Sequence, residues 1–140
     1  MARERDDDAC PGALQTHPTA DGELARIRLP GGIITAAHLE AVAHAASEFG
    51  SSTIELTSRG NLQVRAIRDT EAAAELVAAA GLLPSPTHER VRNIVASPLS
   101  GRSGGVCDIR GLVTALDTAV QQDPRLARLP GRFLFALDDG

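Results

Sequence analysis

Apolar and polar residues alternate most clearly over Thr53–Ile67, in the stretch TIELTSRGNLQVRAI. Two short alternating runs, Thr53–Thr57 and Leu62–Ile67, flank the four residues Ser58–Asn61. Alternation with a period of two is typical of strands that bury one face. The connection contains glycine and asparagine, which are the residue types that tolerate a positive φ. This stretch therefore predicts a β-hairpin with Arg59 at its tip.

The polar face of the predicted hairpin carries side chains that can bind anions. Gln63 and Arg65 follow Arg59 along this face. Guanidinium groups beside a turn of fixed shape would form an anion-binding surface. The same pattern is also typical of a solvated face with ordinary surface arginines. The pattern alone is compatible with both interpretations.

Four further segments place the hairpin in a ferredoxin-like α+β fold. Residues Leu24–Leu29 alternate and predict the first strand. One helix is predicted over 35–49, from a threonine N-cap to a glycine stop, and a second over 69–81. Val91–Ala96 is short and partly apolar, and it predicts the last strand. The resulting order is β-α-β-β-α-β, the split βαβ arrangement of ferredoxin-like folds.

The predicted topology leaves one face of the sheet open. Both helices cover the same face, so the opposite face would carry Arg26, Arg28, Gln63 and Arg65. We therefore expect an arginine-rich sheet face that is available to a ligand or to a second domain.

The rest of the chain predicts its domain organisation. Residues 1–22 mix charge, proline and glycine, which is typical of a loosely ordered lead-in. Residues 23–97 contain the predicted half domain. Residues 98–140 contain a flexible loop, a helix and a strand with no following partner. This last segment is expected to be the beginning of a second α+β domain, which is truncated here.

Composition narrows the classes of partner. The formal net charge is −4, so no overall positive field attracts nucleic acid or anionic lipid. RNA-recognition modules of this topology stack bases on aromatic residues, but tryptophan and tyrosine are absent here and the three phenylalanines lie outside the central hairpin. All 14 basic residues are arginine, the residue suited to carboxylate recognition. We expect no nucleic-acid partner.

The sequence predicts neither a metal site nor a membrane segment. Cys10 and Cys107 are the only cysteines, and two thiolates cannot hold a [4Fe–4S] cluster that needs four. The four histidines lack the spacing of metal ligands. The start of the chain, MARERDDDAC, has no apolar run, and no stretch approaches the roughly 20 apolar residues of a membrane span. We therefore expect a cytoplasmic protein.

Three stretches together resemble one superfamily of enzymes. Residues 56–63, LTSRGNLQ, resemble the Thr-x-Arg-x-x-x-Gln signature of the nitrite and sulfite reductase superfamily. Residues 90–98, RVRNIVASP, look like its Arg-Asn-Val segment, and residues 129–133, LPGRF, resemble its Leu-Pro-Arg-Lys-Phe element. Within that superfamily, the segments TSRGNLQVR, RNIVASPLSG and FALDDG are most similar to those of the precorrin-3B synthases of aerobic cobalamin biosynthesis.

The resemblance implies a ferredoxin-like half domain followed by the first part of a catalytic domain. By position, Arg59 corresponds to the signature arginine, Arg92 to the arginine before Asn-Val, and Arg132 to the lysine before Phe. These three residues would bind carboxylates of a tetrapyrrole or substrate, and Arg59 would also be catalytic by stabilising negative charge. The predicted tetrapyrrole-binding or substrate-binding residues are Arg59, Gln63, Arg65, Arg92, Asn93 and Arg132.

The resemblance also implies cofactors that this chain alone is not expected to bind. Full-length relatives hold a [4Fe–4S] cluster through four cysteines in their later part, and reductase relatives hold siroheme. Non-haem iron is a further cofactor compatible with a full-length protein. A missing C-terminal half or a partner chain would have to supply the cysteines, because only two are present here.

Three functions are compatible with these features. Leu134 stands where the reductases have a second lysine, and an apolar residue there fits a tetrapyrrole substrate. We therefore predict the N-terminal part of a precorrin-3B synthase-like iron–sulfur oxidoreductase, inactive by itself. Such an enzyme uses oxygen to hydroxylate precorrin-3A and to form a lactone. One alternative is a fragment of a siroheme nitrite or sulfite reductase, and the other is a non-catalytic module that binds an anion or a partner.

Overall fold

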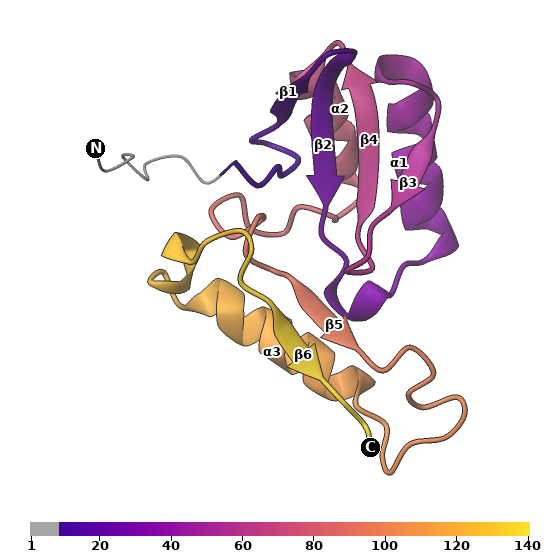
Figure 1. Cartoon of the computed structure of the whole chain (residues 1–140), viewed down its shortest axis with the longest axis vertical. Helices are drawn as coiled ribbons and strands as arrows, with labels where there is room; N and C mark the ends of the chain where they lie inside the picture. Colours follow the sequence, from indigo (N-terminus) through magenta and orange to yellow (C-terminus); the bar gives the residue numbers. More distant parts are fainter. Residues whose placement is uncertain (1–8) are drawn as a thin grey trace.

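Two sheets, one larger than the other, organise the chain (Figure 1). The structure is a computed structural model, and it describes residues 9–140. The larger sheet is antiparallel with strand order β1-β2-β4-β3, and the smaller sheet pairs β5 with β6 in parallel. The elements are β1 (His17–Thr19), β2 (Gly22–Ile27), the 3-10 turn η1 (Pro30–Gly32), α1 (Ala36–Phe49), β3 (Ile54–Leu56), β4 (Leu62–Ile67), α2 (Thr70–Ala79), β5 (Ile94–Ala96), α3 (Arg110–Gln122), the 3-10 turn η2 (Leu126–Arg128) and β6 (Phe135–Leu137).

Helices α1 and α2 lie on the same face of the larger sheet (Figure 1). Apolar side chains of the central strands, among them Ile27 and Leu62, are buried in one cluster with Val42 of α1 and Val77 of α2. Burial of these side chains is the main favourable term that holds the two layers together. The opposite face of the sheet is covered by neither helix, as the sequence predicts.

Both helices of this layer begin at the N-caps that the sequence predicts. The Thr35 hydroxyl accepts a hydrogen bond from the His38 amide at 3.1 Å, and the Asp69 carboxylate accepts one from the Ala72 amide at 3.0 Å. Each cap satisfies an amide that the first helical turn leaves without a partner. Gly50 follows the end of α1, and its amide donates to the helix.

The predicted hairpin is confirmed as β3 and β4. Glu55 lies opposite Gln63 across this pair, and Arg26 of β2 lies opposite Gln63 on the other side. Gly60, in the connection, has a φ of 70°. A Cβ there would lie only 3.3 Å from the Cα of Gly32, so both the conformation and the close approach favour glycine.

The α+β class and the ferredoxin-like half domain are confirmed, but the predicted place of the last strand is wrong. Of Val91–Ala96, only β5 is a strand, and it pairs with β6 outside the larger sheet. The fourth strand of the larger sheet is β1, within the segment that was expected to be a loose lead-in. Proline at Pro18 suits an edge strand, because a missing amide costs no ladder bond there. Residues 1–8 of that lead-in lie outside the described part of the chain.

The second unit consists of β5, β6 and α3 (Figure 1). Helix α3 buries Val113 and Val120, and β5 buries Ile94. Both β5 and α3 contact η1, so this unit lies directly against the end of β2. Within residues 9–140, no helix combines the length and the apolar character needed to cross a bilayer. The cytoplasmic location stays a prediction.

Candidate functional site

A ladder of polar side chains crosses the open face of the larger sheet. Arg26 Nη2 donates a hydrogen bond to Gln63 Oε1 at 2.8 Å, and Gln63 Nε2 donates to Glu55 Oε2 at 2.6 Å. The three residues come from β2, β4 and β3, and the strand register places them side by side. The Gln63 amide thus links a cation to an anion and is itself buried. Gln63 is therefore fixed in position on the face where the sequence predicts it.

Arg65, which was expected to continue this polar face, makes a separate contact. Its Nε lies 3.6 Å from Asp21 Oδ2 in a partly exposed ion pair. The pKa of Asp21 is lowered, first by the hydroxyl of Thr19 and to a smaller extent by Arg65. Arg65 is thus engaged at the β1–β2 turn, and within residues 9–140 its side chain forms no hydrogen bond or ion pair with the ladder.

Arg59, at the hairpin tip, reaches the second unit. Its Nη1 donates a hydrogen bond to the backbone carbonyl of Arg132 at 3.1 Å. This contact joins two stretches that are 73 positions apart in the sequence and that both carry predicted site residues. The structure thus brings the side chain of Arg59 to the backbone of Arg132, and Arg132 is not among the residues that line the cleft described next.

A cleft of about 580 Å³ opens beside this contact, between the half domain and the second unit. Its cationic lining comes from Arg59 on one side and from Arg102 and Arg110 on the other. Arg110 also pairs with Asp108 at 2.7 Å, and this contact lowers the pKa of Asp108 to about 2. Arg102 makes no side-chain hydrogen bond within residues 9–140, so its charge is available in the cleft. The cleft has the size and charge to take an anionic organic ligand.

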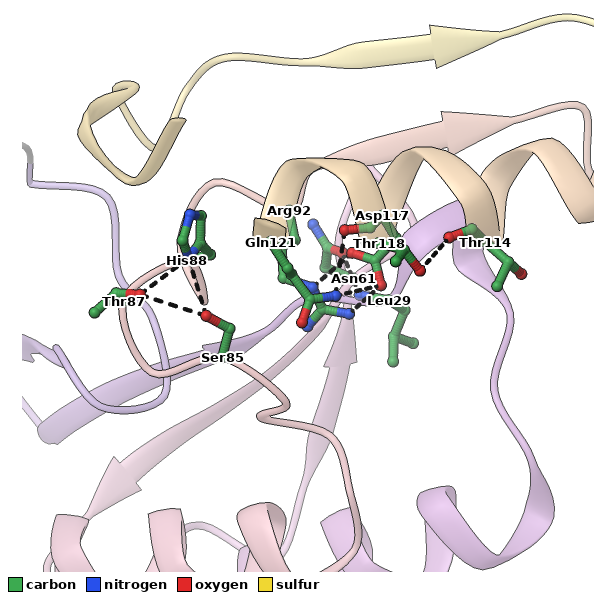
Figure 2. Close-up of polar contacts among 10 residues, drawn as sticks. All are labelled: Leu29, Asn61, Ser85, Thr87, His88, Arg92, Thr114, Asp117, Thr118 and Gln121. Carbon is green, nitrogen blue, oxygen red and sulfur yellow. Dashed lines mark hydrogen bonds and ion pairs between the residues drawn. The ribbon is translucent and has the colours of Figure 1, made fainter. Parts of the chain in front are cut away.

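Arg92 is buried in an ion pair, as Figure 2 shows. Its Nε and Nη2 donate to the two carboxylate oxygens of Asp117 on α3, at 2.6 and 2.8 Å. Gln121 Nε2 also donates to Asp117 at 3.0 Å. Two of the donors of Arg92 are therefore used to attach α3 to the segment before β5. A role for Arg92 in ligand binding stays a prediction.

Asn93 and Asn61 form a buried link between the two units. Asn93 Nδ2 donates to the carbonyls of Arg90 and Gly131, at 3.0 and 2.8 Å. Asn61 Oδ1 accepts from the Leu29 amide at 2.9 Å (Figure 2). Asn61 Nδ2 lies 3.5 Å from Asn93 Oδ1. Because Asn93 donates to the carbonyl of Gly131, it positions the turn before β6 that Arg59 contacts.

Sequence reasoning missed several residues of this region. The sequence placed Arg26 on the open face, because it alternates with Ile27, but did not include it among the site residues. The strand register places Arg26 opposite Gln63. The cleft arginines, Arg102 and Arg110, come from a loop and a helix start whose position depends on the tertiary structure. The sequence identified Asn61 only as a residue of the hairpin turn and did not indicate its buried contact with Asn93.

The described residues do not form a metal site. Within residues 9–140, no group of three or more His, Cys, Asp or Glu side chains is arranged to hold a metal ion. Cys10 and Cys107 are not joined in a disulfide. The ring nitrogens of His88 contact the hydroxyls of Ser85 and Thr87 and the carbonyl of Asp123. A [4Fe–4S] cluster therefore does not fit this part of the chain.

The half domain matches a known protein family. Residues 17–80 match the family described as the nitrite/sulfite reductase ferredoxin-like half domain. This range begins at the first residue of β1 and ends just after α2. Residues 17–80 are a nitrite/sulfite reductase ferredoxin-like half domain. The family boundaries agree with the observed sheet, because both include β1 in the half domain and exclude β5.

Longer similarities extend beyond the half domain. A ferredoxin–nitrite reductase of Synechococcus elongatus is 33% identical over 126 residues, which cover 84% of this chain and 25% of that protein. The ferredoxin–nitrite reductase of Leptolyngbya laminosa is 30% identical over 130 residues, which cover 86% of this chain and 26% of that protein. A precorrin-3B synthase of a Sinorhizobium species is 42% identical over 59 residues, which cover 42% of this chain and 13% of that protein. The chain spans about a quarter of the length of the nitrite reductases. No solved structure matches it.

Proposed function

We propose that this chain is the N-terminal part of an oxidoreductase that binds a polycarboxylated tetrapyrrole beside its nitrite/sulfite reductase half domain. The observation that carries the proposal is the cleft of about 580 Å³, with Arg59 on one wall and Arg102 and Arg110 on the other. Guanidinium groups on two sides suit a flat ring that bears several carboxylates, because such a group can donate two parallel hydrogen bonds to a carboxylate. Arg102 is available for this, whereas Arg59 and Arg110 have only the nitrogens that Arg132 and Asp108 leave unused.

The residues around the cleft would bind and orient the ring. Arg59 is anchored through one nitrogen to the carbonyl of Arg132, which restricts its motion at the cleft wall. Asn93 supports the same turn before β6 through the carbonyl of Gly131. Siroheme, when bound, would supply a redox-active iron, whereas a precorrin would itself be the substrate. The arginine-lined cleft fits the carboxylates of either group, and the cysteines for a cluster would have to come from another part of the protein.

A precorrin-3B synthase-like activity is the form of this proposal that we favour. Leu134 is exposed two residues after Arg132, so the surface there is apolar where a second cation would favour a small oxyanion. The similarity to a precorrin-3B synthase, 42% over 59 residues, supports this choice. The second candidate is a ferredoxin-dependent nitrite reductase, because similarity to two such enzymes extends over 84% and 86% of the chain.

The proposed binding site can be tested on the 140-residue chain itself. Titration with uroporphyrin, a polycarboxylated porphyrin, is expected to quench its fluorescence in a saturable manner. Arg59→Gln is expected to weaken binding by about tenfold, the loss typical of one charge-assisted hydrogen bond. Arg125→Gln is the matched control, since this exposed arginine pairs with Asp123 and does not line the cleft. Equal affinities of the wild-type and Arg59→Gln chains would contradict the proposal.

The two candidate activities differ in what the native protein contains. The polypeptide purified from its source cells is expected to lack the absorption bands of siroheme and to convert precorrin-3A only in the presence of oxygen. Siroheme bands together with nitrite reduction would favour the second candidate. A native protein that binds uroporphyrin but contains no iron would instead favour a non-catalytic binding module.

A further inference from the structure

The loop between β5 and α3, residues 98–108, carries one of the cleft arginines. Arg102 lies in this loop and lines the cleft together with Arg110, the first residue of α3. Within this loop, which the structure describes completely, every residue except Ser100 is exposed. Three of its residues are glycines with a positive φ. Because an exposed loop of this kind has little packing to fix its shape, the place of Arg102 depends on a few contacts.

Ser100 forms the base of this loop. The residue is only 4% exposed, although it borders the cleft. Its Oγ accepts a hydrogen bond from the amide of Ile109 at 3.0 Å and donates one to the carbonyl of Cys107 at 3.3 Å. The bond to the Ile109 amide is buried, so removal of the hydroxyl would leave that amide without its acceptor. One hydroxyl thus closes the loop and fixes its start against the beginning of α3.

Gly101, the next residue, lies directly on the guanidinium of Arg110. A Cβ at Gly101 would be 2.6 Å from both Nε and Nη2 of Arg110 and 2.6 Å from Cγ of Asp108. A side chain there would displace one of these two groups, and the φ of 71° at Gly101 also favours glycine. The amide of Arg102 then donates to the carbonyl of Leu99 at 2.8 Å. The turn that carries Arg102 therefore rests on the Arg110–Asp108 ion pair.

The far end of the loop is attached to a different segment. The amide of Val106 donates to the carbonyl of Asp139, after β6, at 2.6 Å. A Cβ at Gly105 would overlap the carboxylate of Asp139, so the backbone approaches closely there. Between the two attachments, the side chains of Arg102 and Ser103 form no hydrogen bond within residues 9–140. Ser100 is the attachment that is nearer to Arg102 in the sequence.

We propose that Ser100 is a positioning residue of the cleft, which holds Arg102 where it can bind a carboxylate of the ligand. The Ser100 hydroxyl is used by Ile109 and Cys107, so it acts through Arg102 and not by touching the ligand. A loop that is already fixed before binding loses less conformational entropy when its arginine binds, and this raises the affinity. The inference rests on the proposed function, because the carboxylate belongs to the polycarboxylated ring in the cleft.

A double-mutant cycle with uroporphyrin tests this role. Ser100→Ala is expected to weaken binding by about two- to fivefold, the same loss as Arg102→Gln. If Ser100 acts through Arg102, the variant with both changes should bind no more weakly than Arg102→Gln alone. Ser103→Ala, the same change at an exposed position of this loop, is the matched control and should leave the affinity unchanged. Additive losses in the double variant, or wild-type affinity of Ser100→Ala, would overturn the proposal.

The salt dependence of binding separates positioning of a charge from a general effect on folding. Loss of one cationic contact should make the affinity less sensitive to sodium chloride, because salt screens interactions between charges. Ser100→Ala and Arg102→Gln are expected to show the same reduced sensitivity, and Ser103→Ala the sensitivity of the wild-type chain. Unchanged salt dependence in Ser100→Ala would mean that the hydroxyl only stabilises the fold, and this would overturn the proposal.

A measurement on the wild-type chain keeps the proposal testable if Ser100→Ala does not fold. Hydrogen exchange at the amide of Ile109 is expected to be slow without ligand, because Ser100 accepts its hydrogen bond. With labelled arginine, the Nε–H resonance of Arg102, assigned with Arg102→Gln, is expected to shift when uroporphyrin is added. Fast exchange at Ile109, or an Arg102 resonance that stays in place, would overturn the proposal.

The outcomes separate this inference from the proposed function. If uroporphyrin binds and Arg59→Gln weakens it, but the Arg102 resonance stays in place, the inference is wrong and the proposed function stands. If uroporphyrin does not bind the wild-type chain, the proposed function is wrong and the ligand-positioning role of Ser100 is overturned with it. If uroporphyrin binds and the losses from Ser100→Ala and Arg102→Gln are not additive, both are supported.

Discussion

Arg28 and Arg92 are buried to almost the same degree, with 3% and 5% of each residue exposed. Two nitrogens of Arg92 donate to Asp117, whereas two nitrogens of Arg28 have no partner among the described residues. The second unit thus supplies a carboxylate for the arginine that precedes β5. Within residues 9–140, no carboxylate accepts a hydrogen bond from Nε or Nη1 of Arg28, the arginine that follows β2.

The difference indicates two uses of the same side chain. A buried arginine with a bidentate carboxylate attaches one element to another, and loss of one partner leaves the other charge buried without compensation. A buried arginine without acceptors lowers the stability of the protein and is kept where it binds something else. On this basis the ion pair of Arg92 attaches α3 to the segment before β5, and a further role of Arg92 in ligand binding stays a prediction. The following predictions test this distinction, beginning with the largest effect.

Removal of the partner of Arg92 should have the largest effect on folding. Asp117→Ala leaves Arg92 buried without its carboxylate, and we expect a loss of roughly 3–5 kcal/mol in the free energy of unfolding. Urea denaturation followed by circular dichroism measures this loss. Asp123→Asn, which breaks the exposed pair with Arg125, is the control and should have little effect. A small effect of Asp117→Ala would remove the distinction between the two arginines.

Asn93→Ala should be the next most damaging change. It removes the donor to the carbonyls of Arg90 and Gly131 and leaves both without that bond. We expect a loss of roughly 1–3 kcal/mol in urea denaturation. Thr114→Ala, which removes an exposed hydroxyl from α3, is the control. If the two variants were equally stable, the link between the units would not depend on Asn93.

The dependence on pH should distinguish Arg28 from exposed arginines. Its pKa of about 10 lies below the ordinary value of 12.5, so folding disfavours its charged form. Arg28 is therefore expected to lose its proton as the pH rises through about 10. The same titration relieves the unfavourable charge, so this group should make the fold more stable above pH 10. Urea denaturation between about pH 8 and pH 11 measures this gain in stability; a constant free energy of unfolding over this range would contradict the prediction.

Asp108→Asn should have the smallest effect and the opposite sign. Asp108 lies beside Arg110 and, with a pKa of about 2, stays ionised until the pH falls to that value. Its removal would free the charge of Arg110 in the cleft and should strengthen uroporphyrin binding by about two- to fivefold. Arg102→Gln should weaken binding by a similar factor. Weaker binding by Asp108→Asn would mean that the cleft does not bind the carboxylates.

The local parts of the fold could be predicted from the sequence. Alternation identified the hairpin of β3 and β4, and Thr35 and Asp69 identified the starts of α1 and α2. These signals act between residues that are close in the chain, so a short stretch contains all the information. The resemblance of residues 56–63 also identified the family of the half domain.

The partners of the site residues depended on the tertiary structure. Residues 25 positions apart form the Arg92–Asp117 pair, and residues 73 positions apart form the contact from Arg59 to Arg132. The predicted place of the last strand was wrong for the same reason. The pairing of β1 with β2 and of β5 with β6 depends on contacts between distant segments, which no short stretch of sequence contains.

Sequence alone thus determined that this chain contains a ferredoxin-like half domain with arginines along one sheet face. Only the tertiary structure decided which arginines have partners. Charge and burial are properties of the folded surroundings, and one side chain can be a structural link or a binding group according to whether a carboxylate lies within hydrogen-bond distance. Arg92 has such a carboxylate in Asp117, and for Arg28 the described chain provides none.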